Sequence, residues 1–243
     1  MIYRFIPFAI VCAAVAAAPA LLQAQEPAPQ GQKAAPRIGR FGESTGPRVA
    51  LFFKEEWKTV PGGGEHGVSQ EQVGNPDLEL KLYGTESDKV QVLGSATDPS
   101  NPPHVWTGLA ASPVIIALRD KNNFADLTGL ARVRWVTKVS GLHKVHPAIK
   151  LANGTWLVGD YEDGSTADWH VSEISFDQVH WLRIDPTKVL VHGNVVEHPD
   201  LTKVDEIGFA DLIPGSGHGP GGWSDVASIE VYGKSVPRTS ASK

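Results

Sequence analysis

Short stretches in which apolar and polar residues alternate recur along the chain. Residues 78–83 (Leu-Glu-Leu-Lys-Leu-Tyr) alternate cleanly, and residues 131–139 place apolar side chains on one face and basic side chains on the other. Successive side chains of a β-strand point to opposite faces, so this pattern predicts strands with one buried face. Residues 114–118 (Val-Ile-Ile-Ala-Leu) form an unbroken apolar run, which predicts a central strand.

The strongest hairpin signal is Asn153-Gly154, which separates the strand-like residues 149–151 from 155–158. Long stretches with the 3.6-residue period of a helix are missing, although residues 122–130 predict one short helical turn. Further strand-like segments are 169–176, 179–184, 188–191, 204–209 and 226–232. About ten short strands separated by turn signals predict an all-β fold, a single-domain antiparallel β-sandwich or jelly roll.

The N-terminal residues depart from this pattern. Arg4, the apolar residues 5–20 and the small residue Ala24 have the layout of a secretory signal peptide. The apolar run is shorter than the ~20 residues of a membrane span, so we expect cleavage, no span afterwards, and a periplasmic or secreted protein. The expected organisation is a signal peptide, a flexible Pro/Ala/Gln-rich linker, the β-sandwich domain and a polar tail, at residues 1–24, 25–48, 49–234 and 235–243.

Cysteine content and charge narrow the classes of function. The single cysteine, Cys12, lies in the predicted signal peptide, so the mature domain cannot form an internal disulfide bond. The formal net charge is −5, and no basic stretch interleaves with aromatic residues, so nucleic acid is not expected as a partner. We expect the mature protein to be a monomer.

Three segments together resemble the galactose-binding-like β-sandwich superfamily, which includes carbohydrate-binding modules. They are residues 126–135 (Asp-Leu-Thr-Gly-Leu-Ala-Arg-Val-Arg-Trp), residues 199–209 (Pro-Asp-Leu-Thr-Lys-Val-Asp-Glu-Ile-Gly-Phe) and residues 226–233 (Val-Ala-Ser-Ile-Glu-Val-Tyr-Gly). In that superfamily an Asp-Leu-Ser/Thr phrase precedes a core strand, and a closing strand ends in a phrase such as Val-Tyr-Gly. The resemblance implies a jelly roll that often binds sugars, and it carries over no site residue.

Candidate ligand contacts come from the aromatic residues, because an apolar ring with a polar edge suits stacking on a sugar. Of the seven tryptophans, three lie in strand-like segments and are predicted to be core: Trp57, Trp135 and Trp181. The glycine-rich loop 215–223 either connects strands through glycines with positive φ or presents its two large side chains to a ligand. The residues expected to contact a ligand are Trp106, Trp156, Trp169, His218 and Trp223.

The acidic loop 160–168 offers oxygen ligands of the kind that calcium prefers. The candidate calcium ligands are Asp160, Glu162, Asp163 and Asp168. A solvated turn is the alternative interpretation, because the loop lacks the twelve-residue EF-hand pattern.

These observations favour an exported, non-catalytic module that binds carbohydrate on a glycan or a glycosylated surface. One alternative is a glycoside hydrolase or polysaccharide lyase that uses the acidic cluster of residues 160–168, because glycosidic hydrolysis needs two facing carboxyl groups. The other alternative is a structural envelope protein without a small ligand.

Overall fold

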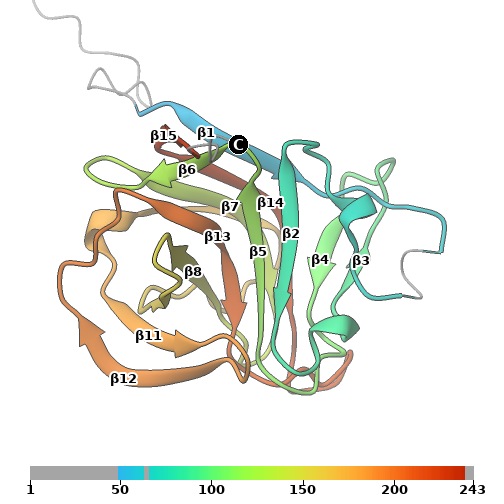
Figure 1. Ribbon diagram of the computed structural model, residues 1–243. Helices are drawn as coiled ribbons and strands as arrows, with labels where there is room; N and C mark the ends of the chain where they lie inside the picture. The colour runs from blue at the N-terminus through green and yellow to red at the C-terminus, as the bar shows by residue number, and fades with distance from the viewer. Residues whose placement is uncertain (1–48, 63–65, 239–243) are drawn as a thin grey trace, which may run out of the picture. The chain divides into compact units, whose positions relative to one another are not determined.

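The computed structural model describes residues 49–62 and 66–238, and within them lie two antiparallel β-sheets and three 3-10 helices (Figure 1). The all-β sandwich predicted from the alternation is confirmed. The predicted signal peptide and linker and residues 239–243 of the predicted tail lie outside the described residues. None of the described helices is long and apolar enough to cross a membrane.

The six-stranded sheet has the order β10-β7-β14-β4-β3, and β1 also pairs with β14. Its strands are β1 (Leu51–Glu56), β3 (Gln91–Leu93), β4 (His104–Trp106), β7 (Arg132–Val139), β10 (His170–Ser175) and β14 (Ser224–Tyr232). β14 is the centre of this sheet. One of its edges pairs with β7 along its length, so β4 and β1 share the other edge, end to end.

The nine-stranded sheet has the order β12-β11-β9-β8-β13-β5-β2, with β6 pairing to β13 and β15 pairing to β6. Figure 1 shows β13, β5 and β2 side by side in this sheet. Its strands are β2 (Leu78–Tyr83), β5 (Val114–Asp120), β6 (Asn123–Asp126), β8 (Val145–Leu151), β9 (Trp156–Gly159), β11 (Trp181–Asp185), β12 (Leu190–Val196), β13 (Val204–Asp211) and β15 (Lys234–Pro237). The short helices are η1 (Gln70–Gln72), η2 (Ser87–Lys89) and η3 (Phe176–Gln178).

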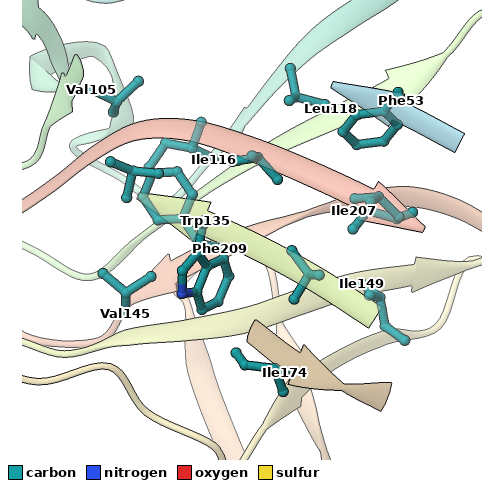
Figure 2. Close-up of a cluster of buried hydrophobic side chains, with 14 of the residues drawn as sticks. Phe53, Val105, Ile116, Leu118, Trp135, Val145, Ile149, Ile174, Ile207 and Phe209 are labelled. Carbon is teal, nitrogen blue, oxygen red and sulfur yellow. The ribbon is translucent and has the colours of Figure 1, made fainter. Parts of the chain in front are cut away.

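The main core lies between the two sheets, where Trp135 and Val105 of one sheet meet Phe209 and Ile116 of the other (Figure 2). A second, smaller apolar cluster includes Ile115, Ala117 and Trp156. Alternate residues of β5 therefore enter different cores, since Ile116 and Leu118 belong to the first cluster and Ile115 and Ala117 to the second. This two-sided burial explains the unbroken apolar run at 114–118.

Two local expectations differ from the structure. Residues 123–126 form β6 rather than a helical turn, because β6 pairs with β13 and with β15. β15 also extends into the segment that we expected to be a polar tail. Its pairing with β6 supplies backbone hydrogen bonds that composition alone does not predict.

Candidate binding face on the six-stranded sheet

The alternation of β7 places Arg132, Arg134, Val136 and Lys138 on the face of the six-stranded sheet that points away from the core, because Trp135 and its alternate neighbours are buried. Their partners on β14 share this outer face: Arg134 lies opposite Glu230, Val136 opposite Ser228, and Lys138 opposite Asp225. The side chains of sequence-distant strands therefore meet in rows across the sheet.

A β-bulge opens the outer face at Ala227. Val226 pairs with Thr137 and Ser228 pairs with Val136, so Ala227 is the extra residue. At the same place one edge of β14 passes from β1 to β4, because β1 ends at Glu56 opposite Ser228 and β4 pairs only as far as Val226. The interrupted edge leaves a hollow between the two strand ends.

We call this hollow and its two neighbours the trough. The central hollow has a volume of about 390 Å³, and Val136, Ala227 and Trp57 supply apolar lining. It adjoins a hollow of about 270 Å³ that Arg134 and Glu230 line, and one of about 510 Å³ that Lys58 and Asn75 line. All three hollows share Glu56. The remaining lining residues of the trough are Lys54, Gly74, Ala96, Pro102, Pro103, Trp135 and Ser228.

Glu230 organises the polar end of the trough. Its carboxylate accepts hydrogen bonds from Arg134 (3.2 Å) and from the Tyr232 hydroxyl (2.8 Å), and it lies 3.6 Å from the Lys54 ammonium. Burial alone would raise the pKa of Glu230, but these donors outweigh it and hold the pKa below its usual value. Lys54 also pairs with Glu56 at 2.7 Å. The trough therefore carries fixed, ionised groups of both signs.

An aromatic cluster lies at the other end of the outer face. The exposed His218 ring stacks on Trp106 with centroids 4.8 Å apart, and it tilts against Trp223 at 5.3 Å. The Trp106 indole lies so close to Gly108 that a Cβ atom there would come within 2.3 Å of the ring. Gly217 donates a backbone hydrogen bond to Gly108, which holds the glycine loop over this indole. Glycine at position 108 is therefore a packing requirement.

Asp225 connects this cluster to Trp169. It is 5% exposed, and it accepts a hydrogen bond from the Trp223 indole at 3.1 Å. Burial raises the pKa of Asp225 to about 7, against the opposing hydrogen bond from Trp223 and the charge of Lys138. His104 lies 3.5 Å from the same carboxyl, and its ring makes a T-shaped contact with the Trp169 ring, with centroids 5.1 Å apart. Burial lowers the pKa of His104.

Four of the five residues expected to contact a ligand therefore belong to one region. Trp106 is buried beneath His218, while Trp169 and Trp223 are half-buried. Trp156 lies apart from them, in the second core against Tyr83, and at 5% exposure it offers no free ring face. The Asn-Gly hairpin before it pairs β9 with β8, and β9 lies between β11 and β8 in the larger sheet. The side chain of Trp156 is therefore buried inside this sheet's second core.

The trough itself was not expected from the sequence. Trp57 was predicted to be core, and it is 4% exposed, yet it lines two of the hollows. The sequence feature that pointed toward the trough was the basic face of residues 131–139, which includes Arg134. The partners of that face depend on pairing with β14 and β1, which the sequence pattern does not specify.

The structure gives each candidate calcium ligand a partner within the chain. Asp160 contacts His180 (2.7 Å), Glu162 pairs with Lys144, and Asp168 accepts from the Trp169 backbone. Asp163 is buried. Its carboxylate accepts from Thr137, Ser172, Trp135 and His170 at 2.7, 2.7, 3.2 and 2.9 Å.

Across residues 49–62 and 66–238, no group of three or more His, Cys, Asp or Glu side chains is arranged to hold a metal ion. The calcium site stays a prediction, and melting the protein with calcium and with a chelator checks it.

No protein-family profile matches the chain, and no curated protein matches it. Among solved structures, the chain is similar to the family 11 carbohydrate-binding module of the cellulosomal cellulase Lic26A-Cel5E of Clostridium thermocellum, with 16% identity and a TM-score of 0.42 over 66% of this chain and 90% of that one. It is also similar to TmCBM61 in complex with β-1,4-galactotriose, with 14% identity and a TM-score of 0.36 over 64% and 88%.

The carbohydrate recognition domain of Emp47p is a further similar structure, with 6% identity and a TM-score of 0.40 over 76% of this chain and 97% of that one. The similarity to carbohydrate-binding modules that the sequence indicated is thus found among solved structures. These identities and TM-scores leave the function to be inferred from the side chains of the outer face.

Proposed function

We propose that the outer face of the six-stranded sheet binds carbohydrate, along the trough and the adjoining Trp169. The observation that carries this proposal is the composition of the central hollow. Its floor is apolar at Val136 and Ala227, and its rim is polar at Glu56 and Ser228. A pyranose ring has the same division, since its faces carry C–H groups and its edge carries hydroxyl groups.

The side chains around the hollow match the hydrogen-bonding needs of a sugar. Hydroxyl groups both donate and accept, so carboxylates and cations on one rim satisfy them together. Glu56 and Arg134 are of opposite charge and line the same stretch of the trough. Hydrogen bonds to ionised groups are stronger than those between neutral groups. The half-buried Trp169 indole, which donates a hydrogen bond to the Ser100 carbonyl and packs against His104, supports the proposal with a ring suited to stacking.

A glycan array of the mature protein, followed by calorimetry on the strongest hit, tests this proposal. We expect Trp169→Ala to weaken affinity about 3- to 10-fold through the loss of stacking. We expect Arg134→Gln to weaken it about tenfold through the loss of a charge-assisted hydrogen bond. Leu190→Ala is the control, because Leu190 is an exposed apolar residue on the other sheet. Unchanged affinity in both the Trp169→Ala and the Arg134→Gln variant would contradict the proposed site.

The proposal includes the finer expectations from the sequence. The mature protein begins after Ala24, is exported to the periplasm or beyond, and binds its glycan as a monomer without cleaving it. N-terminal mass spectrometry of the exported protein checks the first point. Release of reducing sugar from a bound glycan would contradict the last one.

A further inference from the structure

The cations along the outer face are unequally compensated. Lys54 and Arg134 share Glu230, as described above. Lys58 lines the largest hollow of the trough, and Lys138 lies at the opposite end with its ammonium 6.0 Å from the Trp169 ring centre. Among the described residues, no carboxylate lies within ion-pair distance of either lysine. Both ends of the outer face therefore carry an ammonium group without an ion-pair partner.

The acidic residues nearest to these lysines are poor counter-ions. Glu55 lies near Lys58, but it is buried and accepts hydrogen bonds from the backbone of Gly74 (2.5 Å) and Asn75 (3.0 Å). Asp225 lies opposite Lys138 and already accepts from Trp223. Burial raises the pKa of Glu55 and of Asp225 above their usual values. Both carboxyl groups are held by other donors and form no ion pair with the lysines.

This local excess of positive charge contrasts with the chain as a whole, whose formal net charge is −5. The cations Lys54, Lys58, Arg134 and Lys138 outnumber the ion-paired carboxylates Glu56 and Glu230 on this face. An excess of one sign of charge attracts ligands of the other sign. We infer that the outer face selects anionic glycans, whose carboxylate or sulfate groups contact Lys58 and Lys138 while a sugar ring lies against the apolar floor of the trough. This inference rests on the proposed function and names the class of its ligand.

The experiment compares one backbone in three charge states: dextran, carboxymethyl-dextran and dextran sulfate, beside a glycan array that includes neutral, uronate and sulfated glycans. We expect array hits among the anionic glycans and at least tenfold tighter binding of one charged dextran than of dextran. The two charged dextrans distinguish carboxylate from sulfate recognition. Poly-L-glutamate is the polyanion without a sugar, and we expect it to bind at least tenfold more weakly than the preferred dextran.

The variants test the two lysines directly. We expect the double variant Lys58→Gln/Lys138→Gln to weaken binding of the preferred anionic dextran about tenfold at low salt and to flatten its salt dependence. The matched control is Lys188→Gln/Lys203→Gln, which removes the same charge from two exposed lysines that also have no ion pair among the described residues. We expect this control to keep the affinity and the salt dependence of the unmodified protein.

The outcomes separate this inference from the proposed function. Array hits confined to neutral glycans, or equal affinity for all three dextrans, would overturn the preference for anions while the carbohydrate proposal stands. Equal loss in the two double variants would show long-range attraction rather than contact, and would overturn the assignment of the lysines. Equal binding of poly-L-glutamate would show that the cations bind any polyanion. A complete absence of array hits would overturn the proposed function itself.

Discussion

The Asp163→Ala variant is expected to lose about 4 kcal/mol of unfolding free energy, a large share of the stability of a typical domain. Asp163 is 7% exposed, and one of its carboxylate oxygens accepts from Trp135, Thr137 and Ser172 while the other accepts from His170. Truncation removes four hydrogen bonds to a charged group, each worth about 1.5–3 kcal/mol, and it takes this acceptor from the fully buried Thr137 hydroxyl. Urea denaturation followed by tryptophan fluorescence measures the loss.

The neighbouring Glu162 provides the control. Glu162 lies one residue away in the same loop, and its partner Lys144 is similarly exposed. Exposed ion pairs contribute about 0–1 kcal/mol, so we expect Glu162→Ala to change stability by less than 1 kcal/mol. A loss below 1 kcal/mol in Asp163→Ala as well would mean that water replaces the carboxylate, and would contradict its role as the link between this loop and β7.

This role bears on the two chemical interpretations of the acidic loop. A carboxylate that accepts four hydrogen bonds within the chain has few lone pairs left for calcium. A hydrolase that used Asp163 would rely on a carboxylate that already accepts hydrogen bonds from the Trp135 indole and from the Thr137 and Ser172 hydroxyl groups. The sequence shows the acidic residues of the loop but cannot show that Asp163 turns inward while Glu162 turns outward to Lys144.

Strands with a clear local pattern could be predicted from the sequence. The alternation at 131–139 corresponds to β7, and the Asn153-Gly154 signal corresponds to the turn between β8 and β9, where Gly154 has a φ of +86°. A glycine relieves the strain of that conformation, so the dipeptide alone carries the information. The apolar run at 114–118 corresponds to β5 for the equally local reason that both of its faces are covered.

The trough could not be predicted in this way, because it depends on pairing between distant segments. It requires the extra residue Ala227 in β14 and the meeting of β1 and β4 on one edge of that strand. A one-residue change in register would send the opposite set of side chains to the outer face. Trp57 shows the same limit, since its burial was predictable while its place in the wall of a hollow depends on where β1 ends.

Asp225 is expected to make the protein more stable at acidic than at neutral pH, and Asp225→Asn is expected to remove this dependence. The pKa of its carboxyl rises from 3.8 to about 7 on folding, chiefly because the group is buried. The folded state therefore binds a proton more tightly than the unfolded state. The stabilisation is complete below about pH 4, and it is lost as the pH rises through about 7. A pKa shift of this size corresponds to a change of about 4 kcal/mol in the free energy of unfolding.

Urea denaturation from pH 4.5 to 8.5 measures the effect as the difference between the two proteins. The asparagine retains an acceptor for the Trp223 indole, so we expect similar stability at the acidic end and a more stable variant at pH 8. Burial lowers the pKa of His104 and His146, so both groups destabilise the folded protein as the pH falls. Both histidines are present in each protein, and the comparison is therefore made on the difference between the two curves. Parallel curves for the two proteins would contradict the raised pKa.

The same titration has a functional consequence at Lys138. The groups near this lysine on the outer face are Asp225, His104 and the Trp169 ring, and the lowered pKa of His104 keeps that imidazole neutral near pH 7. Protonation of Asp225 then leaves Lys138 as the uncompensated charge of this end. We expect affinity for an anionic dextran to rise severalfold between pH 8 and pH 6 in the unmodified protein. In Asp225→Asn the affinity should be high at both pH values, and an unchanged rise would mean that another group titrates.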